Sequence, residues 1–369
     1  MGCMKMLFNN FLNKIKTNKK NSLIVAGLLI ITISATTTYF ISKPKPSAEA
    51  ENFPEVLSAQ TELDLSQIAP EDLTTLTILL LGYGGAGHQG GFLTDVIQLA
   101  QIDFEKSQIN LISVPRDLWV KLPNDKQAKI NTTFTLGEDP NKPIASGGQV
   151  AKQMTTAITG LQIDYFIAVD FVGFKRLIGE ELDGLEVNVP ETLDDSWYPI
   201  KGEELNPCGM TPQEIAEATA NYSGFELEKQ FECRYEHLYF PQGLVKMEGG
   251  DALAYVRSRH GSAGGDFSRS QRQHALLKAI GNKLWSIEAL KNAPDFFKKT
   301  AKHFTTDIDL EIVKYLVPTL KTTKDFKIKS VVLSTENVFT TSKSSAGAFI
   351  VIPKTSWQNV HSYIQQQLN

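Results

Sequence analysis

The stretch AYVRSRHGSAGGDFSRSQRQ, residues 254–273, carries a local excess of positive charge. It contains four arginines and one histidine but a single acidic residue, Asp266. The whole chain has a formal net charge of −4, so a generally basic composition does not explain the excess. Arginine guanidinium groups form paired hydrogen bonds to phosphate oxygens. The stretch therefore indicates a binding site for an anionic ligand, a phosphate group above all.

The elements that carry these arginines decide where they point. Residues 253–260, LAYVRSRH, predict a strand in which period two places Arg257 and Arg259 on one face and His260 on the other. Glycines then break the strand, and Asp266 is predicted to cap a following helix. We therefore expect a strand, a glycine turn and a helix N-terminus around one site.

The predicted helix points two polar side chains toward its apolar face. Arg269 and Gln273 continue the apolar stripe at helical spacing, whereas Arg272 falls on the flank. Burying an arginine on such a face is costly unless an anion or a partner neutralises it. The pattern favours anion binding, and salt bridges to acids that are distant in sequence are the alternative.

Two further charged side chains lie at the ends of predicted strands. Arg116 directly follows the strand at residues 108–115, and Asp95 lies near the start of an apolar strand at residues 94–103. By itself, such an aspartate is as compatible with a turn as with chemistry. Beside a phosphate site it can serve as a general base or as a metal ligand.

Several cofactor and catalytic classes are excluded. Gly82, Gly84 and Gly87 match G-x-G-x-x-G after a strand, but the next segment reads as a second strand and not as the helix that a dinucleotide fold requires. The sequence contains no motif of a phosphate-binding loop, a zinc hydrolase or a serine hydrolase. It also lacks an extended basic surface with interleaved aromatic residues, so we expect no nucleic-acid partner.

Predicted strands and helices alternate along residues 76–284. This alternation favours a layered α/β/α domain with a central mixed sheet. Residues 194–241 interrupt it and are predicted to be an insertion, whereas residues 285–369 are predicted to form a helical and hairpin extension, with the hairpin at residues 327–354. Cys208 and Cys233 are equally compatible with a disulfide and with free thiols.

The N-terminal part predicts one transmembrane helix. Residues 22–41 contain no charged side chain, and a helix of this length spans a bilayer core of about 30 Å. Lysines without acids precede it, so residues 1–21 are expected in the cytoplasm and the rest outside the cell. Residues 42–75 read as an extracytoplasmic linker. A signal peptide cleaved near Ala48 and Ala50 is the alternative.

The order of several segments resembles the LytR-CpsA-Psr family. These segments are LLLG with TDVIQLAQID, ISVPRD, KIN, IDYFIAVDFVGF, LDGLEVNVP, YFPQGLVKMEGGDALAYVRSRH and DFSRSQRQ. The resemblance implies a membrane-anchored extracytoplasmic phosphotransferase. Such an enzyme moves a glycopolymer from a polyprenyl-pyrophosphate carrier onto peptidoglycan or another cell-wall acceptor.

The resemblance also implies roles for the charged residues. Arg116, Arg257 and Arg259 would bind the pyrophosphate, and the same pocket would be lined by Arg269 and Gln273. 

Asp95 matches the second of two family aspartates that are linked to catalysis and to Mg²⁺ (or Mn²⁺), as base or as metal ligand. Gly84 stands where the family has the first of these aspartates. His88, water or phosphate oxygens would then have to complete the metal's ligands.

Two other functions suit the same residues. A hydrolase would cleave the lipid pyrophosphate with water as acceptor, and a non-catalytic envelope protein would bind an anionic lipid or polymer. The three functions differ in their products, which are a coupled polymer, a free sugar phosphate and an unchanged ligand.

Overall fold

A computed structural model of the 369-residue chain describes Phe53 and residues 68–69, 72–88, 90–137, 139, 141, 143–262, 264–284, 292–322 and 326–369. The predicted transmembrane helix at residues 22–41 and most of the predicted linker lie outside the described residues. Among the residues that are described, no helix is long and apolar enough to cross a membrane. Residues from Asn52 to Asn369 form one compact unit.

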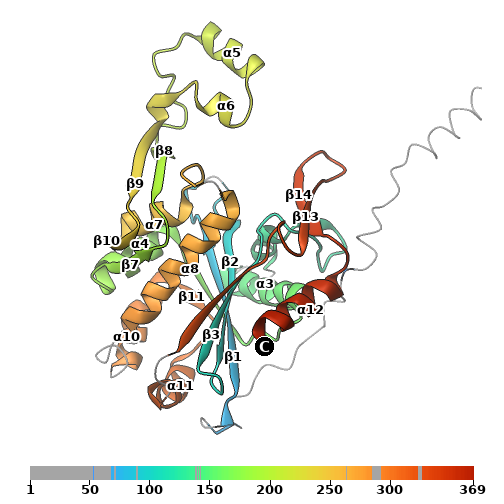
Figure 1. Ribbon diagram of the computed structural model, residues 1–369, viewed down its shortest axis with the longest axis vertical. Helices are drawn as coiled ribbons and strands as arrows, with labels where there is room; N and C mark the ends of the chain where they lie inside the picture. Colours follow the sequence, from blue (N-terminus) through green and yellow to red (C-terminus); the bar gives the residue numbers. More distant parts are fainter. Residues whose placement is uncertain are drawn as a thin grey trace, which may run out of the picture. The chain divides into compact units, whose positions relative to one another are not determined.

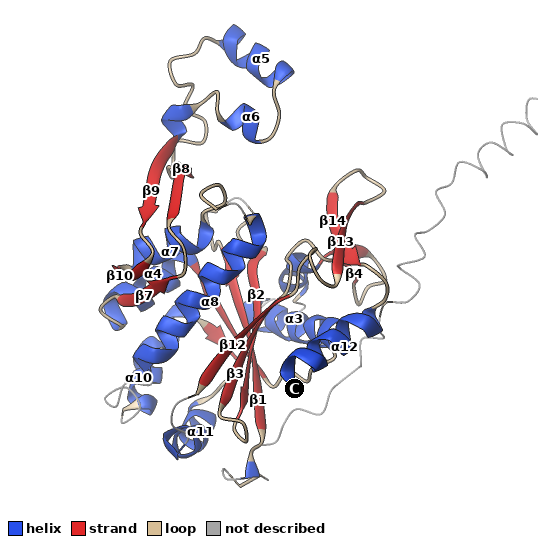
Figure 2. Ribbon diagram, in the orientation of Figure 1, coloured by secondary structure: helices blue, strands red, loops and turns tan. Residues whose placement is uncertain are grey.

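A mixed sheet forms the centre of this unit (Figures 1 and 2). Within the described residues it has six strands in the order β11-β6-β1-β2-β3-β12. Their bounds are β1 (Thr75–Tyr83), β2 (Thr94–Asp103), β3 (Gln108–Ser113), β6 (Tyr165–Asp170), β11 (Thr305–Thr306) and β12 (Lys327–Val332). Strands β1 and β6 are parallel, as are β3 and β12, and the remaining neighbours are antiparallel. The predicted α/β fold with a central mixed sheet is confirmed.

Helices cover both faces of the sheet and explain why its strands are apolar on both sides. On one face, α3 (Pro143–Thr159) and α12 (Trp357–Leu368) pack through residues such as Met154 and Ile364 against Leu79 and Leu99. On the other face, α8 (Gly265–Leu284) and α11 (Leu310–Thr322) cover a second layer of apolar side chains. Strands that are buried on both faces read as continuous apolar runs, which is the pattern of β1.

A neighbouring core holds α8 beside a short two-stranded sheet. It is formed by α4 (Phe171–Arg176), the π-helical turn η4 (Leu177–Glu181), β7 (Leu185–Val189), β10 (Gly243–Met247) and α7 (Gly249–Arg257). The remaining elements of the first half are β4 (Trp119–Lys121), β5 (Gln127–Lys129) and η3 (Ile130–Leu136). Tyr255 of α7 is fully buried in this neighbouring core.

Residues 190–242 contain an arm that leaves the domain between β7 and β10 (Figure 1). Its stem is the antiparallel pair β8 (Leu193–Pro199) and β9 (Tyr235–Phe240), and its tip holds α5 (Pro212–Asn221), α6 (Phe225–Glu228) and η5 (Glu232–Arg234). A disulfide joins Cys208 to Cys233 within the arm. The arm coincides with the insertion predicted at residues 194–241, and the disulfide decides between the two states that the sequence left open.

The C-terminal segment completes the central sheet at both of its edges. Strand β11 pairs with β6, and β12 pairs with β3, so the hairpin predicted at residues 327–354 is only partly present. The observed hairpin is β13 (Phe339–Lys343) with β14 (Phe349–Pro353). The other helices of this segment are α10 (Ala293–Thr300) and η6 (Ala301–His303). The prediction of a strand at the start of this hairpin is correct for β12. Its partner is the distant strand β3, where Lys327 pairs with Gln108, 219 residues earlier in the chain.

The strand predicted at residues 253–260 is wrong. Residues up to Arg257 form helix α7, which begins after Glu248, and the Glu248 backbone N–H donates to the Asp251 carboxylate at 3.2 Å. The buried residues of α7 lie at helical spacing and are Ala252, Tyr255 and Val256. Over so few residues, this spacing can be mistaken for the alternation of a strand. Asp266 is the second residue of α8 and not its cap, because the helix begins at Gly265.

Candidate functional site

Three arginines from separate segments meet at one pocket. Arg116, Arg259, Gly265 and Arg269 line a pocket of about 180 Å³. Arg116 lies in the loop after β3, Arg259 in the loop after α7, and Arg269 one turn into α8. Gly265 begins α8, whose first backbone N–H groups also favour anions. The predicted convergence of Arg116, Arg259 and Arg269 is therefore observed. We call this site the arginine pocket.

A β-bulge places Asp95 beside the arginine pocket. Gly82 pairs with Val96 and Tyr83 pairs with Thr94, so Asp95 is the extra residue of β2 at this point. Bulges re-aim side chains at the ends of sheets. The Asp95 carboxylate forms an ion pair with Nη1 of Arg116, and the Asp95 side chain remains 42% exposed.

The Arg116 guanidinium has a second carboxylate nearby. Its Nε lies 3.6 Å from Asp117, whose other oxygen lies 2.6 Å from Nζ of Lys129. Ion pairs of Asp117 with Arg116 and Lys129 therefore restrain the loop after β3.

Arg257 does not line the arginine pocket. Its guanidinium lies 4.5 Å from the centre of the Phe171 ring, a cation–π distance, and its Nη1 donates to the Tyr198 hydroxyl at 3.4 Å. Burial raises the pKa of Tyr198 above its usual value. The shared strand face predicted for Arg257 and Arg259 does not exist, because Arg257 is the last residue of a helix and Arg259 belongs to the following loop.

Gln273 lies one turn below Arg269 in a buried polar layer. Its Oε1 accepts a hydrogen bond from Nε2 of Gln98 at 2.9 Å. The same Nε2 donates to Ser113 Oγ, and Ser113 Oγ lies 2.8 Å from Nε2 of His274. Burial lowers the pKa of His274 to about 4, so its imidazole is neutral at pH 7. The prediction that Gln273 points inward is correct, but its amide oxygen contacts Gln98 and it does not line the pocket described here.

Sequence and structure comparisons agree on one family. A sequence profile of the LytR_cpsA_psr family matches residues 37–362. The chain belongs to this family. Its relative TagV of Bacillus subtilis (strain 168), a polyisoprenyl-teichoic acid–peptidoglycan teichoic acid transferase, is 25% identical over 238 residues, which are 63% of this chain and 49% of TagV. TagU of Enterococcus faecalis (strain ATCC 700802 / V583), a transferase of the same description, is 21% identical over 252 residues, 68% of this chain and 67% of TagU.

The fold of this LytR_cpsA_psr protein is also that of a solved relative. The crystal structure of Bacillus subtilis TagV matches with a TM-score of 0.55 and 22% identity, covering 80% of this chain and 97% of that one. At this identity the likeness establishes the fold. The chain spans about half the length of the TagV relative that it matches in sequence.

The family resemblance predicts a Mg²⁺ site, and the donors at the arginine pocket fit it poorly. Gly84 supplies no carboxylate, and a Cβ at this position would lie 2.9 Å from Cγ of His88. His88 itself packs edge-on against Phe171, with ring centres 5.2 Å apart. Asp95 is already paired with Arg116. Mg²⁺ needs about six oxygen ligands, so these residues do not form a metal site by themselves.

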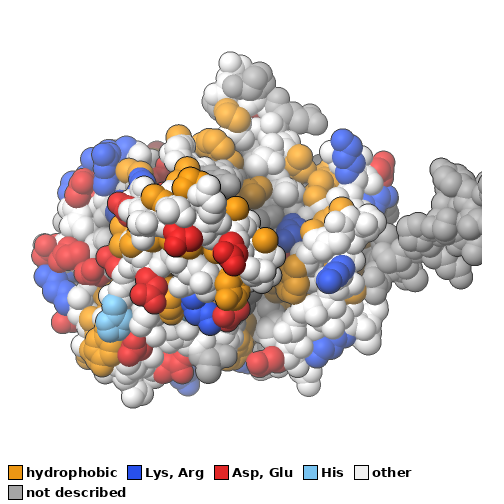
Figure 3. Space-filling view, turned by 90° about the horizontal axis from the view of Figure 1, so that it is seen from above, with side chains coloured by type: hydrophobic (Ala, Val, Ile, Leu, Met, Phe, Trp, Pro, Cys, Tyr) orange, Lys and Arg blue, Asp and Glu red, His pale blue; other side chains and the backbone are white. Residues whose placement is uncertain are grey.

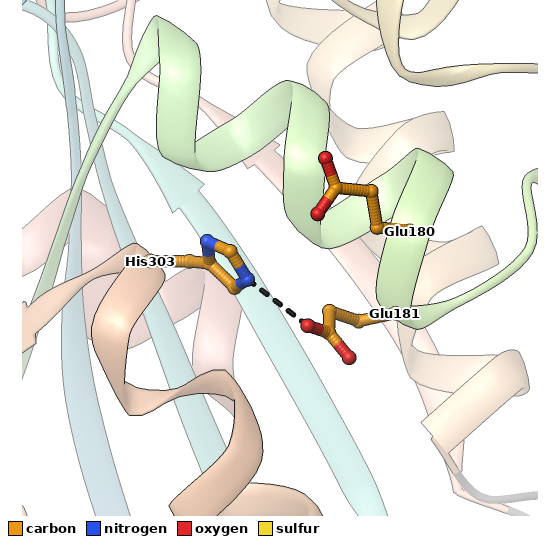
Figure 4. Close-up of side chains that lie close together, drawn as sticks. All are labelled: Glu180, Glu181 and His303. Carbon is orange, nitrogen blue, oxygen red and sulfur yellow. Dashed lines mark hydrogen bonds and ion pairs between the residues drawn. The ribbon is translucent and has the colours of Figure 1, made fainter.

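A different cluster contains three groups of the kinds that bind metals. Among the residues that the structure describes, Glu180, Glu181 and His303 are the one such group (Figure 4). The Glu181 carboxylate lies 2.5 Å from Nζ of Lys299, 3.4 Å from Nζ of Lys302 and 3.1 Å from Nε2 of His303. Hydrogen bonds from Lys299, which has the larger effect, and from His303 lower the pKa of Glu181 to about 2. Cations of the protein already occupy this carboxylate, and we call the cluster the tail joint because it links η4 to α10 and η6.

The sequence did not reveal two buried charged residues near the arginine pocket. Arg272, predicted on the flank of its helix, is only 3% exposed, and Asp195 of the arm is 1% exposed. Their hydrogen bonds reach the loop that carries Arg259. Asp195 lies 63 residues from Ser258, its partner, and no local pattern connects the two.

Proposed function

We propose that this protein is a phosphotransferase that moves a glycopolymer from a polyprenyl-pyrophosphate carrier onto peptidoglycan or another cell-wall acceptor. The observation that carries the proposal is the arginine pocket, where Arg116, Arg259 and Arg269 converge beside the carboxylate of Asp95. The names of the relatives TagV and TagU, teichoic acid transferases, support the same reaction class.

The proposed reaction exchanges one phosphorus–oxygen bond for another. An acceptor sugar hydroxyl attacks the phosphorus that is bonded to the glycopolymer. The bond from this phosphorus to the bridging oxygen breaks, polyprenyl monophosphate leaves, and a phosphodiester joins glycopolymer and acceptor. In this step the hydroxyl proton must be removed while negative charge is held on the phosphate oxygens.

Asp95 and Arg116 together provide these two functions. When the Arg116 guanidinium turns from Asp95 to a phosphate oxygen, the Asp95 carboxylate is released at the edge of the pocket and can accept the hydroxyl proton. Arg259 and Arg269 then hold the other phosphate oxygens. Preorganised donors of this kind lower the barrier because they need no rearrangement as charge develops.

The proposed function has a place for a bound metal ion and for a membrane anchor. If Mg²⁺ takes part, Asp95 is the protein carboxylate that can reach it, and most of its ligands must be phosphate oxygens and water. An anchor at residues 22–41 would hold the pocket on the extracytoplasmic side, close to the lipid carrier.

A product assay tests the proposed function. The full chain in detergent micelles is incubated with a polyprenyl-pyrophosphoryl sugar, peptidoglycan fragments and Mg²⁺. We expect sugar phosphate coupled to peptidoglycan and a stoichiometric release of polyprenyl monophosphate. Free sugar phosphate without coupling would identify a hydrolase, and an unchanged donor that stays bound would identify a binding protein.

A pair of variants ties the product to the pocket. Arg116→Ala should abolish coupling, since it removes both a phosphate ligand and the partner of Asp95. Arg176→Ala is the matched control, because Arg176 is exposed and faces Glu180 at 3.9 Å, outside the lining of the pocket. Full activity of Arg116→Ala would contradict the assignment of the site.

A further inference from the structure

The loop that carries Arg259 is held from two sides by buried charged residues. It connects α7, which ends at Arg257, to α8, which begins at Gly265. Arg272 reaches the loop from α8, and Asp195 reaches it from β8 of the arm. Both side chains are almost completely buried, so each requires a specific partner.

Asp195 binds the loop through one of its carboxylate oxygens and the arm through the other. One oxygen accepts from Ser258 Oγ at 2.6 Å and from the backbone N–H of His260 at 3.4 Å. The other oxygen accepts from the backbone N–H of Trp197 at 2.8 Å, which fixes the carboxylate within the arm. The residues on either side of Arg259 are thereby attached to the same group.

Arg272 binds the loop from α8. Its Nε donates to the backbone carbonyl of Tyr255 at 2.9 Å, and its Nη2 donates to the carbonyl of Ser258 at 2.5 Å. Its Nη1 donates to Ser262 Oγ, also at 2.5 Å. Ser258 is therefore bonded to Arg272 through its carbonyl and to Asp195 through its hydroxyl, and it is 1% exposed.

The loop also approaches the arm too closely for an added side chain. A Cβ at Gly261 would lie 2.6 Å from Leu193 and 2.8 Å from Cβ of Asp195. Further out, the His260 ring stacks on Phe225 of α6 with centres 4.3 Å apart. The arm thus contacts the loop at its stem and at its tip.

These contacts determine the side from which Arg259 leaves the loop. Ser258 ends α7 with φ −50° and ψ 139°, so the chain leaves the helical path at this residue. The buried Ser258 side chain is directed toward Asp195, whereas the next residue, Arg259, is exposed and lines the pocket.

We propose that Asp195 and Arg272 are positioning residues that set Arg259 against the bound pyrophosphate, and that the arm is therefore part of the machinery of the site. The proposal rests on the proposed function, because it assumes that Arg259 binds phosphate. It assigns the arm a purpose in substrate binding, although none of its residues lines the arginine pocket.

The test compares two neighbouring aspartates of β8. Asp195→Asn keeps the shape of the side chain but leaves one acceptor oxygen where there were two. Asp194→Asn is the matched control, because Asp194 is exposed and bonds His237 at the surface. Binding of farnesyl pyrophosphate to the full chain in micelles is measured by titration calorimetry. We expect Asp195→Asn to weaken binding about tenfold or more and Asp194→Asn to leave it unchanged.

A double-mutant cycle separates positioning from a general structural role. In the Arg259→Ala background, Asp195→Asn should cost little further affinity, because the side chain that it positions is gone. Equal losses in both backgrounds would overturn the proposal. Ser258→Ala, which removes the hydroxyl that Asp195 binds, provides a milder variant with the same expected pattern if Asp195→Asn folds poorly.

Different binding results would overturn the two proposals. If Arg116→Ala and Arg259→Ala both leave farnesyl pyrophosphate binding unchanged, the arginine pocket is not the phosphate site and both proposals fall. If Arg259→Ala weakens binding while Asp195→Asn and Ser258→Ala do not, the function stands and the positioning role is overturned.

Discussion

The arginine pocket and the tail joint both gather positive charge, but they neutralise it differently. At the tail joint, Lys299, Lys302 and His303 converge on one carboxylate, that of Glu181, whose side chain is 3% exposed. In the arginine pocket, Arg116 has Asp95 and Asp117 as partners, whereas Arg259 makes no ion pair with any described side chain.

The difference separates a structural cluster from the proposed binding site. A buried carboxylate that is surrounded by cations of its own chain has no need for a ligand, and breaking such a pair is expensive. Arginines that converge on one pocket repel one another, and an anion bound between them relieves this repulsion. By residue type alone the tail joint would be a candidate metal site, because glutamate and histidine are common metal ligands.

Exposed acidic groups elsewhere on the surface sharpen this contrast. The arm carries exposed acids such as Glu204, Glu214 and Glu226, and acidic side chains are prominent on the face seen from above (Figure 3). The positive charge of the pocket is therefore local. An anionic lipid headgroup would be attracted at the pocket itself and not over the whole surface.

The largest expected effect is the loss of activity when a pocket arginine is removed. Arg259→Ala should reduce the rate of transfer by about 100-fold to 1,000-fold, because one fixed donor to the developing charge is lost. Its free energy of unfolding should change by less than about 0.5 kcal/mol, since the side chain is exposed. Arg257→Ala, which removes a side chain outside the pocket lining, should lower the rate less. Initial rates measure the transfer activity, and urea denaturation measures the free energy of unfolding. Equal losses of activity in Arg259→Ala and Arg257→Ala would contradict the lining of the arginine pocket.

The opposite pattern is expected at the tail joint. Glu181→Gln should lower the midpoint of thermal unfolding while the affinity for farnesyl pyrophosphate stays unchanged. The pKa of Glu181 is lowered to about 2, so its contribution to stability is fully present above about pH 4.5 and is lost as pH falls toward 2. Glu180→Gln is the control, since Glu180 is exposed. A Glu181→Gln variant with normal stability and weak ligand binding would assign the tail joint to the site.

A smaller effect is expected for the buried layer beneath the pocket. His274 has a pKa lowered from 6.5 to about 4, so the unfolded chain binds a proton that the folded chain does not. Its neutral form therefore supports stability fully above about pH 6.5, and the loss on going to pH 4 reaches at most about 3 kcal/mol. His274→Gln should flatten this part of the pH profile of the unfolding free energy. Identical slopes for the two proteins between pH 6.5 and pH 4 would refute the buried neutral histidine.

The smallest effect concerns the missing carboxylate. Gly84→Asp alone should bring no tighter Mn²⁺ binding, because a Cβ at this position meets the His88 ring at 2.9 Å. Gly84→Asp together with His88→Ala should make Mn²⁺ bind more tightly in the presence of farnesyl pyrophosphate, with His88→Ala as control. Calorimetry with Mn²⁺ measures this. No gain in the double variant would show that Asp95 and position 84 do not share a metal.

Local patterns predicted most of the elements in the sheet. Strands β2 and β3 lie where they were predicted, because strands that are covered on both faces of a sheet are rich in apolar residues. Arg116, Arg259 and Arg269 were also identified from residue type and spacing. Asp95 was placed near a strand end, but the bulge that re-aims it is a property of pairing with β1.

Other features could not be read from local sequence. Tyr255 and its neighbours fit both alternation and helical spacing, and the buried environment between β7, β10 and α8 decides for the helix. The separation of Arg257 from the pocket follows from that choice. The edge strand β12 required a parallel partner far away in the chain, and turn signals predicted a hairpin in its place.

By itself, the sequence determined strands β2 and β3, the family and three of the pocket residues, Arg116, Arg259 and Arg269, because these depend on residue type, order and short-range period. Tertiary structure decided which charged side chains are buried and which line the pocket. Asp195 and Arg272 are buried against one loop, and Glu181 against two lysines and a histidine, through contacts between residues 10 to 122 positions apart. Long-range packing sets the burial and the partners of each charge, and these two quantities separate the tail joint from the arginine pocket.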